Sequence, residues 1–131
     1  MKLSNWAGNI IEGKVWGNTV PLLQSSCIEI HKIMVDAGGY CSKHTHQSKV
    51  NAFYVIEGRL EIHRWKSYDL VDVTVLHSGD MSIVPAGEPH MFKAITPVEA
   101  LEIYWAELDH DDIQRDTVGG CDKTPRLENS C

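Results

Sequence analysis

Three histidines in this chain of 131 residues have spacings that suit metal binding. His44 and His46 are separated by one residue, so on a β-strand both side chains point to the same face. His90 follows the turn-forming segment Pro85–Pro89, and an all-β fold can bring it opposite the first pair. Three imidazoles leave coordination positions open for water or substrate. His44, His46 and His90 would therefore suit one divalent metal ion, either Zn, Fe, Ni, Mn or Cu. The alternative, on spacing alone, is that His44 and His46 are ordinary polar residues of a strand.

The elements that must position these histidines alternate in polarity with a period of two, which predicts β-strands. Turns rich in glycine and proline separate them, among them Gly38-Gly39 and Ser78-Gly79-Asp80. Strands are expected over the following ranges: 26–36, 51–58, 59–66, 68–77, 80–87, 90–95 and 98–108. Many short strands at close spacing predict an antiparallel sandwich or barrel. Residues 109–118 are expected to form a short turn of helix.

Two blocks around the histidines carry a family resemblance. The first is "GGYCSKHTHQSKVNAFYVIEG" (38–58), and the second is "GDMSIVPAGEPH" (79–90). The spacing of their glycine, histidine and proline residues resembles the two motifs of the cupin superfamily. This resemblance implies an all-β double-stranded β-helix, the jelly-roll barrel of the cupins. It also implies that the histidines lie on the inner face, where a small ligand can enter the barrel.

Two positions depart from the cupin pattern. Asn51 stands where the pattern usually has glutamate, and Ala94 stands where it usually has asparagine. A neutral amide is a weaker ligand than a carboxylate, so we expect Asn51 either to coordinate weakly or to bind a metal-bound water. Losing the carboxylate makes the site more positive by one charge, which favours an anionic or chelating substrate. A barrel that holds no metal is the alternative.

A longer stretch, residues about 15 to 120, resembles the cupin domain of type II mannose-6-phosphate isomerases. The matching segments are "VWGN" (15–18), "IHKIMVDAGG" (30–39) and "LEIYWAELDHDDIQRDTVGG" (101–120). That family typically has Gln-x-His followed by Glu where this chain has His44, His46 and Asn51. The resemblance implies a metal-dependent isomerase or epimerase that acts on a sugar or sugar phosphate.

An isomerase needs a general base, and Glu102 is our candidate. Tyr104 lies beside it on the same strand face, so both are predicted catalytic residues. The alternative is that Leu101, Ile103 and Trp105 face inward and leave Glu102 outside.

Two other functions stay open at this point. Three histidines without a carboxylate also resemble the Fe(II) sites of some cupin dioxygenases. A non-catalytic module that binds a small ligand is the third hypothesis. In each case the substrate pocket is expected to include Tyr40, Asn51, Phe53 and Phe92.

Composition excludes several classes of partner. The formal net charge is -6, whereas non-specific nucleic-acid binding needs clustered positive charge. No apolar run approaches the roughly 20 residues that span a bilayer. The N-terminal segment lacks the apolar region of a secretory signal, so we expect a cytoplasmic protein that acts on a small molecule. Its four cysteines are expected to be reduced, and a link between Cys121 and Cys131 in the tail is the alternative. One cupin domain is expected over 1–120, with a flexible polar tail over 121–131. The open sheet edges of a jelly roll favour a homodimer.

Overall fold

The structure is a computed structural model that describes residues 10–67, 70–106 and 110–122. Nine β-strands and no α-helix are found within these ranges. The strands are β1 (Glu12–Lys14), β2 (Gly17–Gln24), β3 (Ile28–Val35), β4 (Val50–Glu57), β5 (Leu60–Ser67), β6 (Leu70–Leu76), β7 (Met81–Val84), β8 (His90–Ala94) and β9 (Val98–Trp105).

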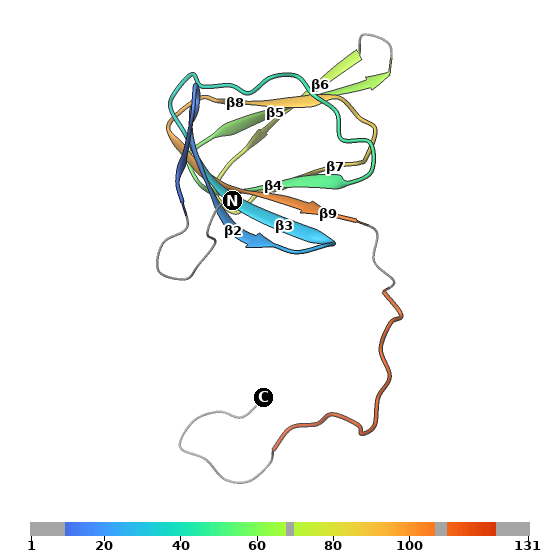
Figure 1. The fold of residues 1–131 in the computed structure, drawn as a ribbon. Coiled ribbons are helices and arrows are strands. Elements are labelled where there is room, and N and C mark those ends of the chain that lie inside the picture. Colours follow the sequence, from blue (N-terminus) through green and yellow to red (C-terminus); the bar gives the residue numbers. More distant parts are fainter. Residues whose placement is uncertain (1–9, 68–69, 107–109, 123–131) are drawn as a thin grey trace.

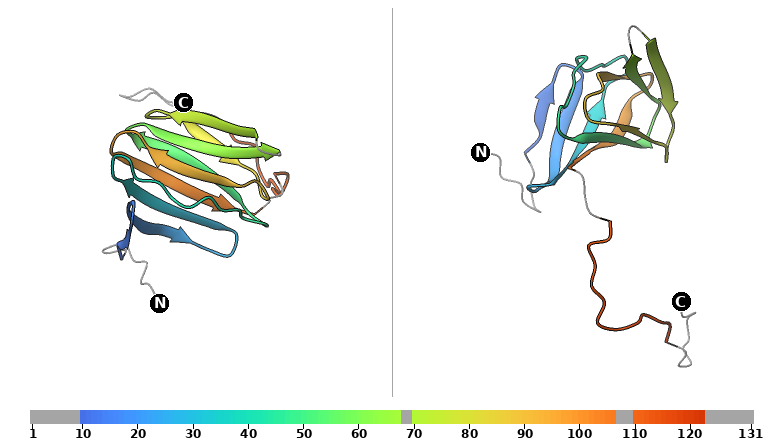
Figure 2. Two further views of the ribbon diagram at one scale, coloured as in Figure 1. Left: turned by 90° about the horizontal axis from the view of Figure 1, so that it is seen from above. Right: turned by 90° about the vertical axis from the view of Figure 1, so that its right-hand side faces the viewer.

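The strands form two antiparallel sheets that face each other (Figure 1). The larger sheet has the order β1-β2-β3-β9-β4-β7, and the smaller one has the order β6-β5-β8. Because β9 lies between β3 and β4, the last strand joins distant parts of the chain. Figure 2 shows both sheets from two further sides, with residues 110–122 running away from them. This arrangement is the jelly roll that the sequence predicted.

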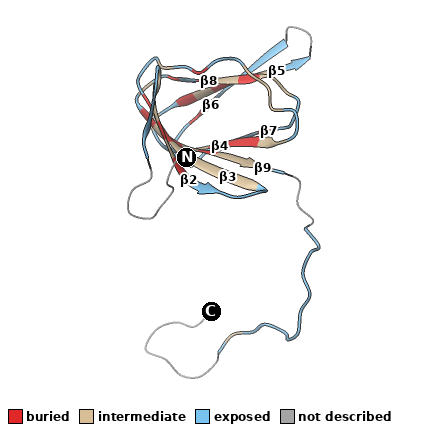
Figure 3. Cartoon of the chain, viewed as in Figure 1, coloured by how far each residue is buried: buried red, intermediate tan, exposed pale blue. Residues whose placement is uncertain are grey.

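The core lies between the two sheets, and Figure 3 shows where the buried positions fall along the strands. Inward-facing residues recur with period two, as Phe53 and Val55 do on β4 and as Phe92 and Ala94 do on β8. Ile62 on β5 packs into the same cluster. All five of these side chains are at most 1% exposed. The sheets therefore form a closed apolar layer, and polar residues continue the inner face toward one end.

Most of the expected strands are observed, and three details differ. The sequence did not predict β1 and β2 as strands, although they form one edge of the larger sheet. The helical turn predicted over 109–118 is wrong for the described residues 110–118, which contain one turn, one bend and otherwise irregular chain. Cys27 and Cys41 are free, but Cys121 is disulfide-bonded, so the prediction of reduced cysteines is wrong for Cys121.

Within the described residues, no helix is long and apolar enough to cross a membrane. The domain limits, the tail over 121–131, the homodimer and the cytoplasmic location stay predictions.

Gly58 joins β4 to β5 and has a positive φ of 96°. A Cβ added there would lie 2.2 Å from the carbonyl oxygen of Pro97. That distance is too short for a real contact, so the turn needs glycine for steric as well as conformational reasons.

We expect Gly58→Ala to lower the free energy of unfolding by about 2 kcal/mol more than Gly79→Ala does. Gly79 is a matched control because its φ is 89° and an added Cβ meets nothing within 4 Å. Both variants carry the strain of positive φ, but only Gly58→Ala adds the clash with Pro97. Chemical denaturation followed by circular dichroism measures the difference, and equal losses would contradict the steric argument.

Candidate metal centre

Backbone hydrogen bonds bring the three histidines together. The N–H of His44 donates to the carbonyl oxygen of His90 at 3.0 Å, and the N–H of His90 donates back at 2.9 Å. The N–H of Gly87 donates to the carbonyl oxygen of His46 at 2.8 Å. These bonds hold the segment that contains both early histidines against the start of β8, although His46 and His90 are 44 positions apart in the chain. The distant residues therefore meet through main-chain pairing.

The turn before His90 is anchored separately by the smaller sheet. Arg64 on β5 forms an ion pair with Glu88, and both side chains are largely buried. The N–H of Trp65 donates to the carbonyl oxygen of Pro89 at 3.0 Å. Arg64 is also the partner of His90 in the β5–β8 register. Two neighbouring residues of β5 thus position the turn that presents His90.

The three imidazoles have the proximity that one metal ion requires. One ligand atom from each of His44, His46 and His90 lies within 4.8 Å of the others. The ring centroids are separated by 4.6 Å between His44 and His90, 4.9 Å between His44 and His46, and 5.3 Å between His46 and His90. The sequence prediction that these residues come together is thus met by the geometry.

Hydrogen bonds to the far side of two rings direct their free nitrogens toward the cluster. Nδ1 of His44 lies 2.7 Å from the carbonyl oxygen of Ser42, and Nδ1 of His90 lies 2.9 Å from that of Glu88. A carbonyl oxygen can only accept, so Nδ1 carries the proton and donates in both rings. With Nδ1 protonated, Nε2 of the neutral ring has a lone pair, and a carbonyl partner on Nδ1 is the arrangement typical of metal-ligating histidines.

His46 supplies a further indication that a metal fits here. Its Nε2 is buried and has no hydrogen-bond partner among the described residues. Burial, followed by the electrostatic influence of His44 and then of Lys49, lowers the pKa of His46 to about 4. Burial likewise lowers the pKa of His90. Both shifts favour the neutral rings of His46 and His90, and neutral imidazole is the form that binds metal.

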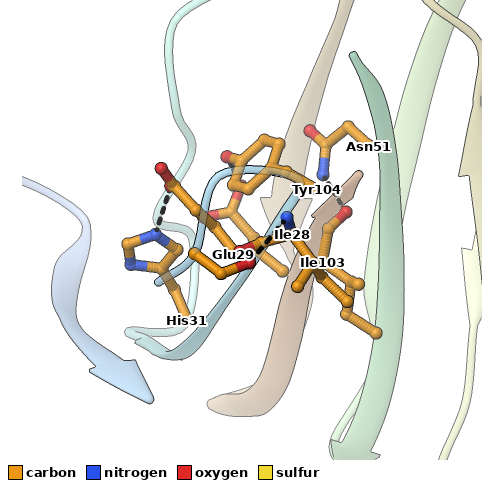
Figure 4. Close-up of polar contacts among 8 residues, drawn as sticks. Ile28, Glu29, His31, Asn51, Ile103 and Tyr104 are labelled. Atoms are coloured by element: carbon orange, nitrogen blue, oxygen red, sulfur yellow. Dashed lines mark hydrogen bonds and ion pairs between the residues drawn. The ribbon is translucent and has the colours of Figure 1, made fainter. Parts of the chain in front are cut away.

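Asn51 lies beside these histidines on β4 and is only 1% exposed. Its Oδ1 is 3.0 Å from Nε2 of His90. Its Nδ2 donates to the carbonyl oxygens of Ala52 at 3.3 Å and Ile103 at 3.5 Å. Figure 4 shows the amide nitrogen directed at Ile103 and the amide oxygen pointing away from it. The amide is thus held with its oxygen toward the cluster.

Glu102 and Tyr104 on β9 face the inside of the barrel beside the histidines. The register pairs Asn51 with Tyr104 and Phe53 with Glu102. The hydroxyl of Tyr104 donates to Oε2 of Glu102 at 2.9 Å. Burial raises the pKa of Glu102, and the bond from Tyr104 opposes this only in part. Burial also raises the pKa of Tyr104, which keeps its proton.

A cavity of about 270 Å³ connects these groups, because His44, Glu102 and Tyr104 all line it. His31 lines it too, which the sequence analysis did not predict. His31 pairs with Glu102 across β3 and β9, and its Nε2 lies 3.1 Å from Oε2 of Glu29 (Figure 4). Its alternation with the buried Ile33 and Val35 on β3 would have placed it on the inner face.

The expected aromatic pocket residues occupy different environments. Phe92 lines the cavity, and Phe53 packs beneath it with a centroid separation of 6.0 Å. Tyr40 is 60% exposed and is not among the residues that line the cavity. Residues 41–43 are not in a strand, so the alternation that would put Tyr40 beside His44 is interrupted. Cys41, which is 8% exposed, takes the inward position instead.

Comparisons with known proteins agree with this architecture. A family model described as a cupin domain matches residues 31–105. The fold is similar to an RmlC-like cupin from Shewanella frigidimarina, at 22% identity and a TM-score of 0.67, covering 83% of this chain and 92% of that one. It is also similar to KdgF from Halomonas sp., at 15% identity and a TM-score of 0.66, covering 76% and 89%.

Oxalate decarboxylase from Bacillus subtilis, a protein with Mn(II) centres, has a TM-score of 0.69 at 19% identity. The match covers 81% of this chain and 29% of that one. A search of curated proteins finds none that matches the sequence. At these identities the structural neighbours establish the fold alone.

We expect His44→Ala to lower the affinity for a divalent metal by at least about 100-fold, because it removes one of three imidazole ligands. His63→Ala is the matched control, since His63 lies on β5 outside the cluster and its Nε2 contacts Glu61 at 2.9 Å. Calorimetric titration with Zn²⁺ and Mn²⁺, together with elemental analysis of the purified proteins, measures the effect. Full metal occupancy in His44→Ala would contradict the proposed ligand set.

We expect Glu102→Gln to stabilise the metal-free protein at about pH 8 and to leave its stability unchanged at about pH 4. The pKa of Glu102 is higher in the folded protein than in the unfolded chain. The wild type therefore loses stability as the pH rises from the pKa of the unfolded state through the pKa of the folded state. Glutamine removes this loss and keeps an oxygen that accepts the bond from Tyr104. Thermal unfolding with a chelator present measures it, and Glu57→Gln at an exposed position is the control. A gain that is independent of pH would contradict this account.

Proposed function

This chain belongs to the cupin family, and we propose that it is a metal-dependent enzyme that moves a proton on a small sugar or sugar phosphate. The observation that carries the proposal is the shared cavity, in which His44 lies with the hydrogen-bonded pair Glu102 and Tyr104. A metal-binding group and a buried acid–base group therefore face the same small volume. An aldose–ketose isomerisation or an epimerisation needs both.

The size and lining of the cavity favour a compact, oxygen-rich substrate. Its volume of about 270 Å³ lies just below the range of roughly 300–1,000 Å³ usual for drug-sized ligands. Polar side chains from several strands line it, among them Lys14, Gln24 and His31. Such groups can bind hydroxyls and negative charge, while Trp16 and Phe92 supply an apolar wall.

The chain's own residues have distinct tasks in this reaction. A divalent ion held by His44, His46 and His90 would supply a Lewis acid for the carbonyl and neighbouring hydroxyl oxygens of the substrate. Glu102 takes a proton from the carbon that bears the hydroxyl and returns it to the adjacent carbon. The hydroxyl proton moves to the carbonyl oxygen, so the substrate is isomerised with no net change in protons. Tyr104 orients the Glu102 carboxyl through its hydrogen bond.

The raised pKa of Glu102 suits this role. A carboxyl whose pKa lies closer to neutral pH is both a stronger base and a usable acid at the operating pH. Burial is the main cause of the shift, because the side chain is only 9% exposed.

A second candidate is a three-histidine Fe(II) oxygenase. The observation in its favour is the neutral donor set, in which three histidines and no carboxylate form the metal-binding group. In this case the open positions of the metal would take a chelating substrate and O₂. Oxygen uptake that depends on both Fe(II) and substrate distinguishes it from isomerisation.

We expect Glu102→Gln to lower the turnover of an aldose or ketose phosphate by about 10²–10⁴-fold, because the amide cannot move the proton. Mannose 6-phosphate and related sugar phosphates are incubated with the metal-loaded protein in D₂O, and NMR follows deuterium entry at the carbon next to the carbonyl. Glu57→Gln serves as the control with unchanged activity. Absence of both turnover and exchange for every aldose and ketose phosphate would overturn the isomerase. Substrate binding without turnover or oxygen uptake would indicate a non-catalytic module.

A further inference from the structure

A second cavity lies next to the one that contains Glu102. Its volume is about 200 Å³, and it lies where three segments meet: the turn between β2 and β3, the residues just before β4, and the end of β9. Tyr104 lines both cavities, so the two adjoin at its ring. The ring centroid of Tyr104 is 5.2 Å from that of His46. The second cavity is therefore a neighbour of the candidate metal centre.

This cavity contains a lysine whose charge is not balanced by a carboxylate. Nζ of Lys49 lies over the ring of Tyr104, 4.2 Å from its centroid. Lys14, Lys32 and Lys66 each form an ion pair with a glutamate. Lys49 forms no ion pair with any residue that the structure describes. The face of an aromatic ring attracts an ammonium group without neutralising it, so Lys49 keeps its positive charge for a ligand.

The rest of the lining is compatible with an anion that accepts hydrogen bonds. Ser26 and Ser48 line the cavity at exposed positions, and each hydroxyl is a possible donor. Ser25 lines it too, but its hydroxyl bonds to the main chain of the turn. Glu29 is the carboxylate among the described lining residues. Its Oε2 lies 3.1 Å from Nε2 of His31, so this carboxylate pairs with the imidazole rather than with the lysine (Figure 4).

We propose that the second cavity binds the phosphate group of the substrate, with Lys49 as its cationic partner. This inference rests on the proposed function and narrows its substrate class to phosphorylated sugars. Several bonds separate the phosphate of a hexose 6-phosphate from its reacting carbons, so the two ends of the substrate need adjacent cavities. Lys49 binds the phosphate oxygens by charge-assisted hydrogen bonds, and Ser26 and Ser48 donate to them. The reacting carbons then lie in the first cavity, beside Glu102.

Cys27 lines the second cavity and gives a test that does not depend on turnover. Its thiol is free and exposed, whereas the free thiol of Cys41 is buried. Alkylation of the metal-loaded protein by iodoacetamide is followed by mass spectrometry of the peptide that contains Cys27. Mannose 6-phosphate and inorganic phosphate should each slow this alkylation, and mannose at the same concentrations should not. Each variant is compared with and without ligand, so a change in the reactivity of the thiol itself does not affect the result.

We expect Lys49→Met to raise the concentration of mannose 6-phosphate that gives half-protection by about 10-fold or more. Lys49→Arg keeps the positive charge and should retain most of the affinity. Lys43→Met is the matched control, because Nζ of Lys43 also lies 4.2 Å from an aromatic ring centroid, that of Trp65, outside this cavity. It should protect Cys27 as the wild type does. If Lys49→Met does not fold, the comparison of mannose 6-phosphate with mannose on the wild type decides.

Turnover distinguishes the phosphate site from the proposed function. Where mannose 6-phosphate is converted, Lys49→Met should raise its KM by about 10-fold or more and change kcat less, because the lysine holds a part of the substrate that does not react. Equal half-protection in the wild type and Lys49→Met, or turnover of mannose 6-phosphate without protection of Cys27, would overturn the phosphate site alone. Protection that depends on Lys49, without turnover or deuterium exchange, would support the phosphate site and contradict the isomerase.

Discussion

The reciprocal hydrogen bonds between the main chains of His44 and His90 are the contact on which the site depends. They join an otherwise irregular segment to the start of β8, at 3.0 Å and 2.9 Å. Without this pairing, nothing in the strand alternation of either segment would bring the three imidazoles to one point. The pairing uses backbone atoms only, so the side chains that it positions are free to bind a ligand. The ion pair between Arg64 and Glu88 supports it by holding the preceding turn.

The inner face of the barrel changes from apolar to polar along each strand. On β4 the inward residues run from Val55 through Phe53 to Asn51, and on β9 they run from Ala100 through Glu102 to Tyr104. The apolar end supplies the hydrophobic stabilisation, and the polar end lies over it. Burial close to this core is what shifts the pKa of Glu102 upward and that of His46 downward. The same packing that stabilises the fold therefore sets the protonation of the candidate site.

The candidate site contains no carboxylate among its metal-facing side chains. His44 and His90 have their Nδ1 protons held by carbonyl oxygens, and Asn51 offers an amide in place of a charged group. Glu102, the proposed acid–base group, lies on β9 and accepts a hydrogen bond from Tyr104 instead of belonging to the metal-binding group. A neutral donor set with a separate acid–base group differs from a site in which a carboxylate is both ligand and charge. This division makes the charge of the metal available to substrate.

The sequence by itself determined the fold and the histidine triad. Alternating polarity predicted seven of the strands, because a sheet with one buried face imposes period two on the chain. The spacing of the two motifs predicted that His44, His46 and His90 meet, and parity placed Glu102 with Tyr104. The tertiary structure alone decided the surroundings of these residues. Tyr40 lies outside because residues 41–43 break the alternation, and His31 lies inside because β3 pairs with β9. The direction of the Asn51 amide depends on two carbonyl oxygens, that of Ala52 on the same strand and that of Ile103 on β9. Asn51 and Ile103 are 52 positions apart, and contacts between such distant residues leave no local sequence pattern.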